Sequence, residues 1–121
     1  MTDRTEIARR WTAMWNLELP AAEIVRADAR IRFGRLPVVP RDEPLIGPAG
    51  LQAVVDATAA RLDGPVFGIH RVVPGDDAEL MTVLWYVEAA ALDRRSGLDL
   101  LRVADGLVAE AWSITGDLPL D

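Results

Sequence analysis

The residues best suited to chemistry lie in one predicted β-hairpin near the C-terminus. Asp105 and Gly106 separate two apolar β-runs, and an Asp-Gly pair accepts the positive φ angles of a tight type I′ turn. With these two residues as the loop, Asp99 faces Trp112 and lies diagonally from Glu110. Two carboxyl groups and a tryptophan then share a sheet face that is otherwise apolar. A polar group there costs free energy unless it is paired, solvated or functional, so this face is the first candidate site.

This pair of carboxyl groups could perform acid–base chemistry. On one sheet face, Asp99 and Glu110 are within reach of one small ligand. Low polarity and a neighbouring like charge both raise a carboxyl pKa, so one group could act as an acid and the other as a base. The alternative is that either carboxylate is solvated at a pocket rim or paired with an arginine.

Two further residues could move a proton. His70 is the only histidine, and histidine is a natural proton carrier near neutral pH, although a structural role is a common alternative. Asp28 could act as a base, or it could be a turn or cap residue that follows a short helix. No set of donors has the spacing of a metal site, so no metal is expected.

Tryptophan is unusually frequent: four of the seven aromatic residues are tryptophans. Each buries a large area, so most should belong to the core. One or two that line a pocket would suit an apolar, planar or polycyclic ligand. Trp85 and Tyr86 are adjacent on a predicted strand, so only one of them can face the pocket. The candidate substrate-binding residues are Trp11, Trp15, Phe33, Trp85 and Trp112.

Composition narrows the functional classes. A chain of 121 residues, half of them apolar, fits one globular domain, residues 1–121. No apolar run is long enough for a membrane span, and the N-terminus has no signal-peptide pattern. The absence of cysteine excludes disulfides and thiolate chemistry and favours a cytoplasmic location. The net charge of −6, with arginines spread along the chain, argues against a nucleic-acid partner. No dinucleotide or phosphate-loop motif is present, so no cofactor is expected.

The chain that positions these residues has an α+β pattern, with helices followed by a bent antiparallel meander. Asp3 is the expected cap of the first helix. Apolar residues on the sheet face opposite Asp99, namely Leu98, Leu100, Ala109 and Ala111, predict a homodimer through that outer face. We expect helices over 4–16, 20–26 and 51–62, a short strand near 31–33, a proline-rich loop over 34–48, strands over 66–73 and 79–92, turns over 74–77 and 93–97, and the hairpin.

Over essentially its whole length the chain resembles the nuclear transport factor 2-like superfamily, which includes SnoaL-like polyketide cyclases and ketosteroid isomerases. The resemblance rests on the order of elements and on local sequence: Asp-Leu-Leu-Arg-Val at 99–103, Asp-Gly-Leu-Val-Ala-Glu-Ala-Trp at 105–112, Arg-Ala-Asp-Ala-Arg-Ile at 26–31 and Leu-Ile-Gly at 45–47. It implies a cone-shaped fold in which a strongly curved antiparallel sheet wraps three N-terminal helices around an internal apolar pocket.

The resemblance also implies roles for single residues. Asp99 matches the isomerases' pocket aspartic acid, which stays protonated and donates a hydrogen bond to an enolate oxygen. Trp112 matches an aromatic residue of the pocket wall.

Other positions depart from the pattern. The isomerases' general base falls near Phe33 or Gly34, and their tyrosine falls near Arg10 or Trp11. The cyclases' acidic residue falls one position before Asp117.

These features together predict a small SnoaL-like enzyme of bacterial secondary metabolism. It would act without a cofactor, by acid–base catalysis, as an isomerase, cyclase or hydrolase on a small apolar carbonyl or polyketide-like molecule. Asp99 would donate a hydrogen bond to the substrate oxygen, and Glu110, Asp28 or His70 would move the proton. The alternative is a ligand-binding or dimerisation module of the same fold without turnover.

Overall fold

A computed structural model describes residues 3–34, 44–90 and 92–120. Within these ranges the chain is α+β, as the pattern predicted. Two α-helices and a 3-10 turn accompany six strands. In chain order the elements are α1 (Arg4–Trp15), η1 (Ala21–Glu23), β1 (Val25–Phe33), β2 (Leu45–Ile46), α2 (Gly47–Leu62), β3 (Val66–Pro74), β4 (Leu80–Ala89), β5 (Leu92–Ala104) and β6 (Leu107–Thr115).

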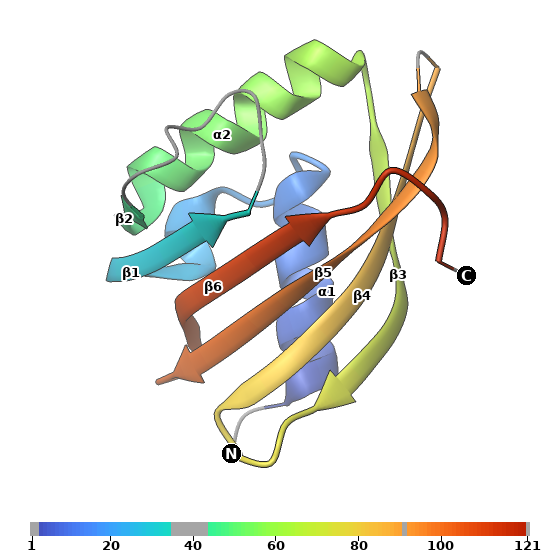
Figure 1. The fold of residues 1–121 in the computed structure, drawn as a ribbon. Helices are drawn as coiled ribbons and strands as arrows, with labels where there is room; N and C mark the ends of the chain where they lie inside the picture. The colour runs from blue at the N-terminus through green and yellow to red at the C-terminus, as the bar shows by residue number, and fades with distance from the viewer. Residues whose placement is uncertain (1–2, 35–43, 91, 121) are drawn as a thin grey trace.

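All six strands form one curved sheet in the order β2-β1-β6-β5-β4-β3 (Figure 1). Strands β3 to β6 are the predicted antiparallel meander. The sheet is not wholly antiparallel, however, because β1 pairs with β6 in parallel. Figure 1 shows α1 behind the sheet and α2 beside β1 and β2, so both helices lie on the side toward which the sheet bends.

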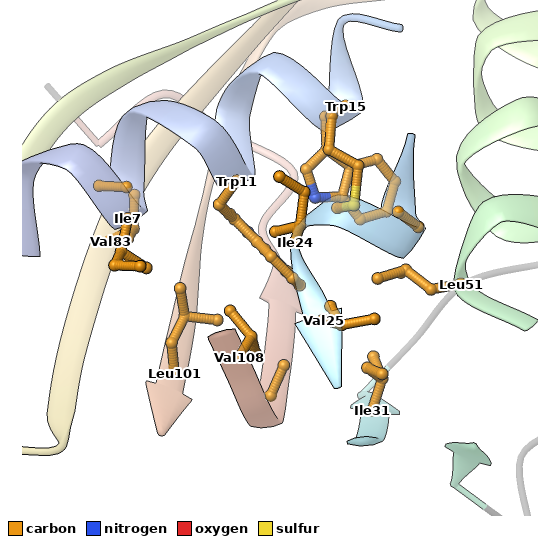
Figure 2. Close-up of a cluster of buried hydrophobic side chains, with 14 of the residues drawn as sticks. Ile7, Trp11, Trp15, Ile24, Val25, Ile31, Leu51, Val83, Leu101 and Val108 are labelled. Carbon is orange, nitrogen blue, oxygen red and sulfur yellow. The ribbon is translucent and has the colours of Figure 1, made fainter. Parts of the chain in front are cut away.

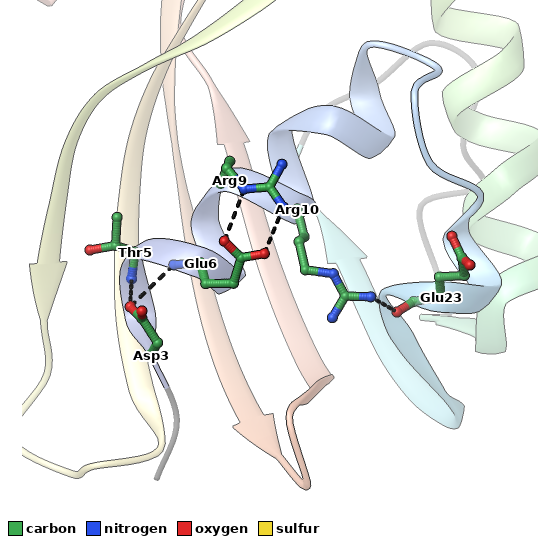
Figure 3. A network of polar contacts seen from close by, with 6 residues as sticks. All are labelled: Asp3, Thr5, Glu6, Arg9, Arg10 and Glu23. Atoms are coloured by element: carbon green, nitrogen blue, oxygen red, sulfur yellow. Dashed lines mark hydrogen bonds and ion pairs between the residues drawn. The ribbon is translucent and has the colours of Figure 1, made fainter.

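Helix α1 forms for the reasons expected from its sequence. The Asp3 carboxylate accepts hydrogen bonds from the amides of Thr5 and Glu6 (Figure 3), which satisfies two free donors of the first turn. Glu6, also in the first turn, pairs with Arg9. One helix face is buried against the sheet; Figure 2 shows Trp11 pointing from α1 toward the strands that carry Leu101 and Val108.

The predicted length of the second helix, residues 20–26, is wrong. Residues 21–23 form a single 3-10 turn, and β1 begins at Val25, a buried β-branched residue that favours a strand. The turn is attached to α1, because the Arg10 guanidinium donates to the Glu23 carbonyl at 2.8 Å (Figure 3). The expected arrangement of three N-terminal helices is therefore replaced by two helices and this turn.

Two predicted irregular segments also differ. Residues 35–43 of the proline-rich loop lie outside the described residues, while Leu45 and Ile46 form β2 and Gly47 begins α2. Residues 93–97, expected as a turn, belong to β5. The helices of the described ranges are too short or too polar to cross a membrane.

Candidate functional site

The predicted hairpin exists, but its register changes after two residue pairs. Asp105 and Gly106 have φ angles of 56° and 76°, as a type I′ turn requires. Val103 faces Val108 as expected, whereas Arg102 faces Glu110. One extra residue, Ala109, therefore lies in β6, which is a β-bulge. Beyond the bulge every pairing is displaced by one position.

This displacement separates the residues that the sequence placed together. Asp99 faces Ser113 instead of Trp112, and both Asp99 and Ser113 are buried on the helix side of the sheet. A shift of one residue moves a side chain to the opposite face of a strand. Glu110 and Trp112 consequently lie on the outer face, so the prediction that they share a face with Asp99 is wrong.

On the outer face Glu110 has two cationic partners. It forms ion pairs with Arg32 at 3.0 Å and with Arg102. The Arg32 guanidinium also lies over the Trp112 ring, 5.3 Å from its centroid. Glu110 and Trp112 are thus parts of a surface cluster that is already paired, which is the alternative that the sequence had left open for Glu110.

On the helix side Asp99 is only 2 % exposed. Its Oδ2 accepts a hydrogen bond from Trp11 Nε1 at 2.8 Å, while Oδ1 has no hydrogen-bond partner among the described side chains. Burial raises the pKa of this carboxyl, and the nearby polar groups of Ser113, Trp11 and Trp85 lower it to a smaller extent. Of these three groups only Trp11 reaches full hydrogen-bond geometry.

Asp99 forms part of the wall of a cavity of about 250 Å³ between α2 and the sheet. Three lining residues of α2 follow helical spacing, so that one helix face borders the cavity. The remaining lining residues come from α1, the strands and the segment after β6. The wall consists of Trp15, Phe33, Thr58, Arg61, Leu62, Trp85, Val87, Leu92, Arg95, Asp99, Ser113, Thr115 and Asp117.

Packed aromatic rings build the apolar part of this wall. Trp15 contacts Phe33 edge-on, with 6.1 Å between ring centroids, and it also contacts Phe67 at 5.6 Å. Phe67 in turn contacts Trp85 at 5.8 Å. Such edge-on and tilted pairs are favourable arrangements of aromatic quadrupoles. The rings therefore support one another, and three of the predicted aromatic residues, Trp15, Phe33 and Trp85, line the cavity.

A glycine determines where the Trp85 ring can lie. Gly97 faces Trp85 across β4 and β5, and a Cβ added at Gly97 would overlap the Trp85 ring and the Ile114 carbonyl. The ring thus occupies the space that any other side chain would fill. Sequence reasoning had treated Gly97 only as a turn residue.

Asp117 is a second carboxylate in the cavity wall. The segment that carries it is attached to β5 on both sides of Asp117: the Gly116 amide donates to the Ser96 carbonyl at 2.9 Å, and the Ser96 amide donates to the Leu118 carbonyl at 3.3 Å. The Ser96 hydroxyl also accepts a hydrogen bond from the Leu120 amide. These contacts hold Asp117 at the rim. One indication of a role for Asp117 came from the sequence: the acidic residue of the resembling cyclases falls one position before it.

The other candidate proton carriers lie away from the cavity. His70 is exposed where the pairing of β3 and β4 shifts register. Asp28 is exposed within β1 and pairs with Arg26 at 3.0 Å. That contact lowers the Asp28 pKa. Trp11 is buried in the core, where it bonds to Asp99 and its ring contacts that of Trp15, 6.4 Å between centroids.

The predicted dimer face is partly altered. Leu98 and Leu100 are exposed on the outer face, together with Ile114, whereas Ala111 is fully buried on the helix side beyond the bulge. The homodimer itself stays a prediction.

Comparison with solved structures shows a shared fold. A candidate isomerase of the SnoaL-like family from Agrobacterium tumefaciens is 18 % identical, with 96 % of this chain and 99 % of that chain covered and a TM-score of 0.76. IdmH from Streptomyces antibioticus, described as a candidate polyketide cyclase, is 18 % identical, with coverages of 93 % and 91 % and a TM-score of 0.74. A de novo designed protein with a curved β-sheet is 11 % identical, with coverages of 93 % and 84 % and a TM-score of 0.71.

No family model and no curated protein matches the sequence. The solved structures nevertheless show that the chain has the fold of SnoaL-like and other nuclear transport factor 2-like proteins, as the resemblance predicted. That a designed protein has a similar fold illustrates that the fold alone carries no function.

Proposed function

We propose that the protein is a small cofactor-free enzyme that catalyses proton transfer on an apolar carbonyl compound bound in the cavity. The observation that carries this proposal is Asp99: a carboxyl group that is buried in a cavity wall and has one oxygen without a partner. In a structural role both oxygens of such a group would be hydrogen-bonded. An unpartnered one is suited to a ligand.

The protonated form of Asp99 supplies the necessary donor. Burial raises its pKa and so favours the neutral acid. Because Oδ2 already accepts the Trp11 N–H, the proton belongs on Oδ1, where it can be donated to a carbonyl oxygen. As the carbonyl becomes an enolate in the transition state, this hydrogen bond strengthens, which is what catalysis requires.

Asp117 is the group in the wall that can take the proton. Its carboxylate would accept a proton from the carbon next to the carbonyl and return it to the same or another carbon, so that no net proton is consumed. The cavity volume of about 250 Å³ lies near the lower end for ligand sites and suits a substrate of about one or two fused rings.

The test is solvent-deuterium exchange at the α-carbon of simple cyclic ketones, namely cyclohexanone, 1-indanone and 2-tetralone, followed by NMR in D₂O. We expect the wild-type protein to accelerate exchange of at least one ketone. Asp99→Asn should lower the acceleration by about 10²–10⁴-fold, because it removes the acidic proton and keeps the shape. Asp117→Asn should lower it by a similar order.

Glu110→Gln is the matched control, since Glu110 is the carboxylate that the sequence paired with Asp99 but that lies on the outer face. This variant should accelerate deuterium exchange of the ketones as much as the wild type does. Equal rates for wild type and Asp99→Asn with all three ketones would overturn the proposed chemistry.

One observation favours the second candidate function, ligand binding without turnover. The position near which the resembling isomerases carry their base holds Phe33, an apolar part of the cavity wall. If the protein only binds its ligand, a ketone in the cavity would quench the tryptophan fluorescence, and the rate of deuterium exchange at the ketone would stay unchanged.

A further inference from the structure

Five buried polar atoms without a hydrogen-bond partner among the described residues belong to side chains that line the cavity. A buried polar group that lacks a partner costs free energy, and each such group requires an explanation. Because they come from α1, α2, β4 and β5 and gather at one place, a common ligand explains them together. The atoms are Trp15 Nε1, Thr58 Oγ1, Trp85 Nε1, Arg95 Nε and Asp99 Oδ1.

The chemical types of these atoms describe the ligand. The indole and guanidinium nitrogens of Trp15, Trp85 and Arg95 can only donate. The Thr58 hydroxyl can do either, and Asp99 donates when it is protonated. The wall is therefore rich in donors, and a ligand that satisfies it must be rich in acceptor oxygens.

Charge in the wall points in the same direction. Arg95 faces Val87 on the helix side of the sheet, and Arg61 reaches the cavity from the last turn of α2. Within the described residues neither guanidinium has a carboxylate within ion-pair distance, so neither is paired with Asp117 of the same wall. In a protein of net charge −6, two cations at one apolar cavity favour an anionic ligand at that place.

We infer that the cavity selects an apolar ring compound that carries an anionic oxygen group, a carboxylate or an ionised enol, and that Arg95 and Arg61 hold this group. The inference rests on the proposed function, because it names the substrate class of the same site. Arg95 and Arg61 hold the anion at the rim while the aromatic rings enclose the apolar body and Asp99 meets a second oxygen. A planar guanidinium suits a carboxylate because it can donate two parallel hydrogen bonds.

The test uses two probes of nearly identical shape, 2-naphthoate and neutral 2-naphthamide, titrated at pH 8 and followed by the quenching of tryptophan fluorescence. We expect the wild-type protein to bind 2-naphthoate about tenfold or more tightly than 2-naphthamide, as a charge-assisted hydrogen bond would produce. Arg95→Gln should weaken the binding of 2-naphthoate by about tenfold and change the binding of 2-naphthamide little. Arg61→Gln should act in the same direction, and less strongly because Arg61 is exposed.

Arg94→Gln is the matched control, one residue away on the same strand. Arg94 lies on the outer face, over the Tyr86 ring at 4.0 Å and in an ion pair with Glu88. This variant loses the same charge but should bind 2-naphthoate like the wild type.

The outcomes separate the inference from the proposed function. Equal binding of the two probes, or equal weakening by Arg94→Gln and Arg95→Gln, would overturn the anion preference while leaving a ligand cavity in place. If neither probe binds, a cavity for small molecules is refuted, and the proposed function fails with the inference.

Discussion

Asp99 and Glu110 lie on neighbouring strands, yet the two faces of the sheet give them opposite environments. Glu110 is held between the guanidinium groups of Arg32 and Arg102 at the protein surface. Asp99 has no cationic partner within ion-pair distance in the described part of the chain and is buried against Trp11. The same functional group is thus paired with two cations on one face and shifted toward its neutral form on the other.

The comparison shows that side-chain type and strand position are insufficient to assign a catalytic carboxyl. The oxygens of a paired carboxylate already have partners, so a ligand that replaces those partners gains little free energy. A desolvated carboxyl with an open oxygen retains interaction energy that a ligand can use. Substitutions confined to one face at a time therefore distinguish the two environments.

The largest structural effect is expected from a pair of glycine substitutions. Gly97→Ala on the helix side would overlap the Trp85 ring, and Gly68→Ala would overlap the Tyr86 ring. Trp85 is enclosed, so we expect Gly97→Ala to lower the free energy of unfolding by about 1–3 kcal/mol and to deform the cavity wall. Tyr86 is half-buried on the outer face and can move, so Gly68→Ala should cost about 1 kcal/mol or less.

Urea unfolding of both variants, with near-UV circular dichroism as a second signal for the tryptophans, measures this difference. Equal losses in the two variants would show that the helix-side wall is no more constrained than the outer face.

The pH dependence of stability should distinguish the raised pKa of Asp99 from an ordinary one. Folded Asp99 keeps its proton to higher pH than unfolded Asp99, so the unfolded state is favoured progressively as pH rises above 3.8, the ordinary value. The free energy of unfolding of the wild type should therefore fall relative to Asp99→Asn across this range, and the difference becomes constant above the folded pKa.

Asp28→Asn provides a control of the opposite sign. The Asp28 pKa is lowered by its contact with Arg26, so the wild type should gain stability relative to this variant as pH rises toward the ordinary value of 3.8 and keep that gain above it. The effect should be small because the pair is exposed. Urea melts between about pH 3 and 8 test both signs, and parallel curves for wild type and Asp99→Asn would contradict the raised pKa.

The smallest effect is expected on the outer face. Glu110→Gln leaves Arg32 and Arg102 without their shared anion and should cost about 1 kcal/mol or less. Its cost should shrink between about 0.05 M and 1 M NaCl, because salt screens charges near the surface. Thermal melts at both salt concentrations measure this, with Asp99→Asn as the comparison that should respond less to salt. A cost that is independent of salt would indicate that Glu110 acts through packing.

Several features of the fold followed from local sequence rules. The Asp3 cap, the Asp105-Gly106 turn and the opposite orientations of Trp85 and Tyr86 depend on near neighbours in the chain, and all agree with the structure. The second helix was overestimated, because the burial of Val25 in the sheet outweighs weak local helix preference. The parallel pairing of β1 with β6 joins distant segments and left no local signal.

For the candidate site, the sequence by itself determined the ingredients: a carboxyl in an apolar strand, a surplus of tryptophans and the turn between the last two strands. Only the tertiary structure decided which of them meet. The extra residue Ala109 in β6 turns Glu110 and Trp112 outward, and the attachment of the C-terminal segment to Ser96 brings Asp117 to the cavity instead. The physical reason is that period-2 alternation assigns faces only relative to a register, and a bulge resets that register where strands from distant parts of the chain must bend together.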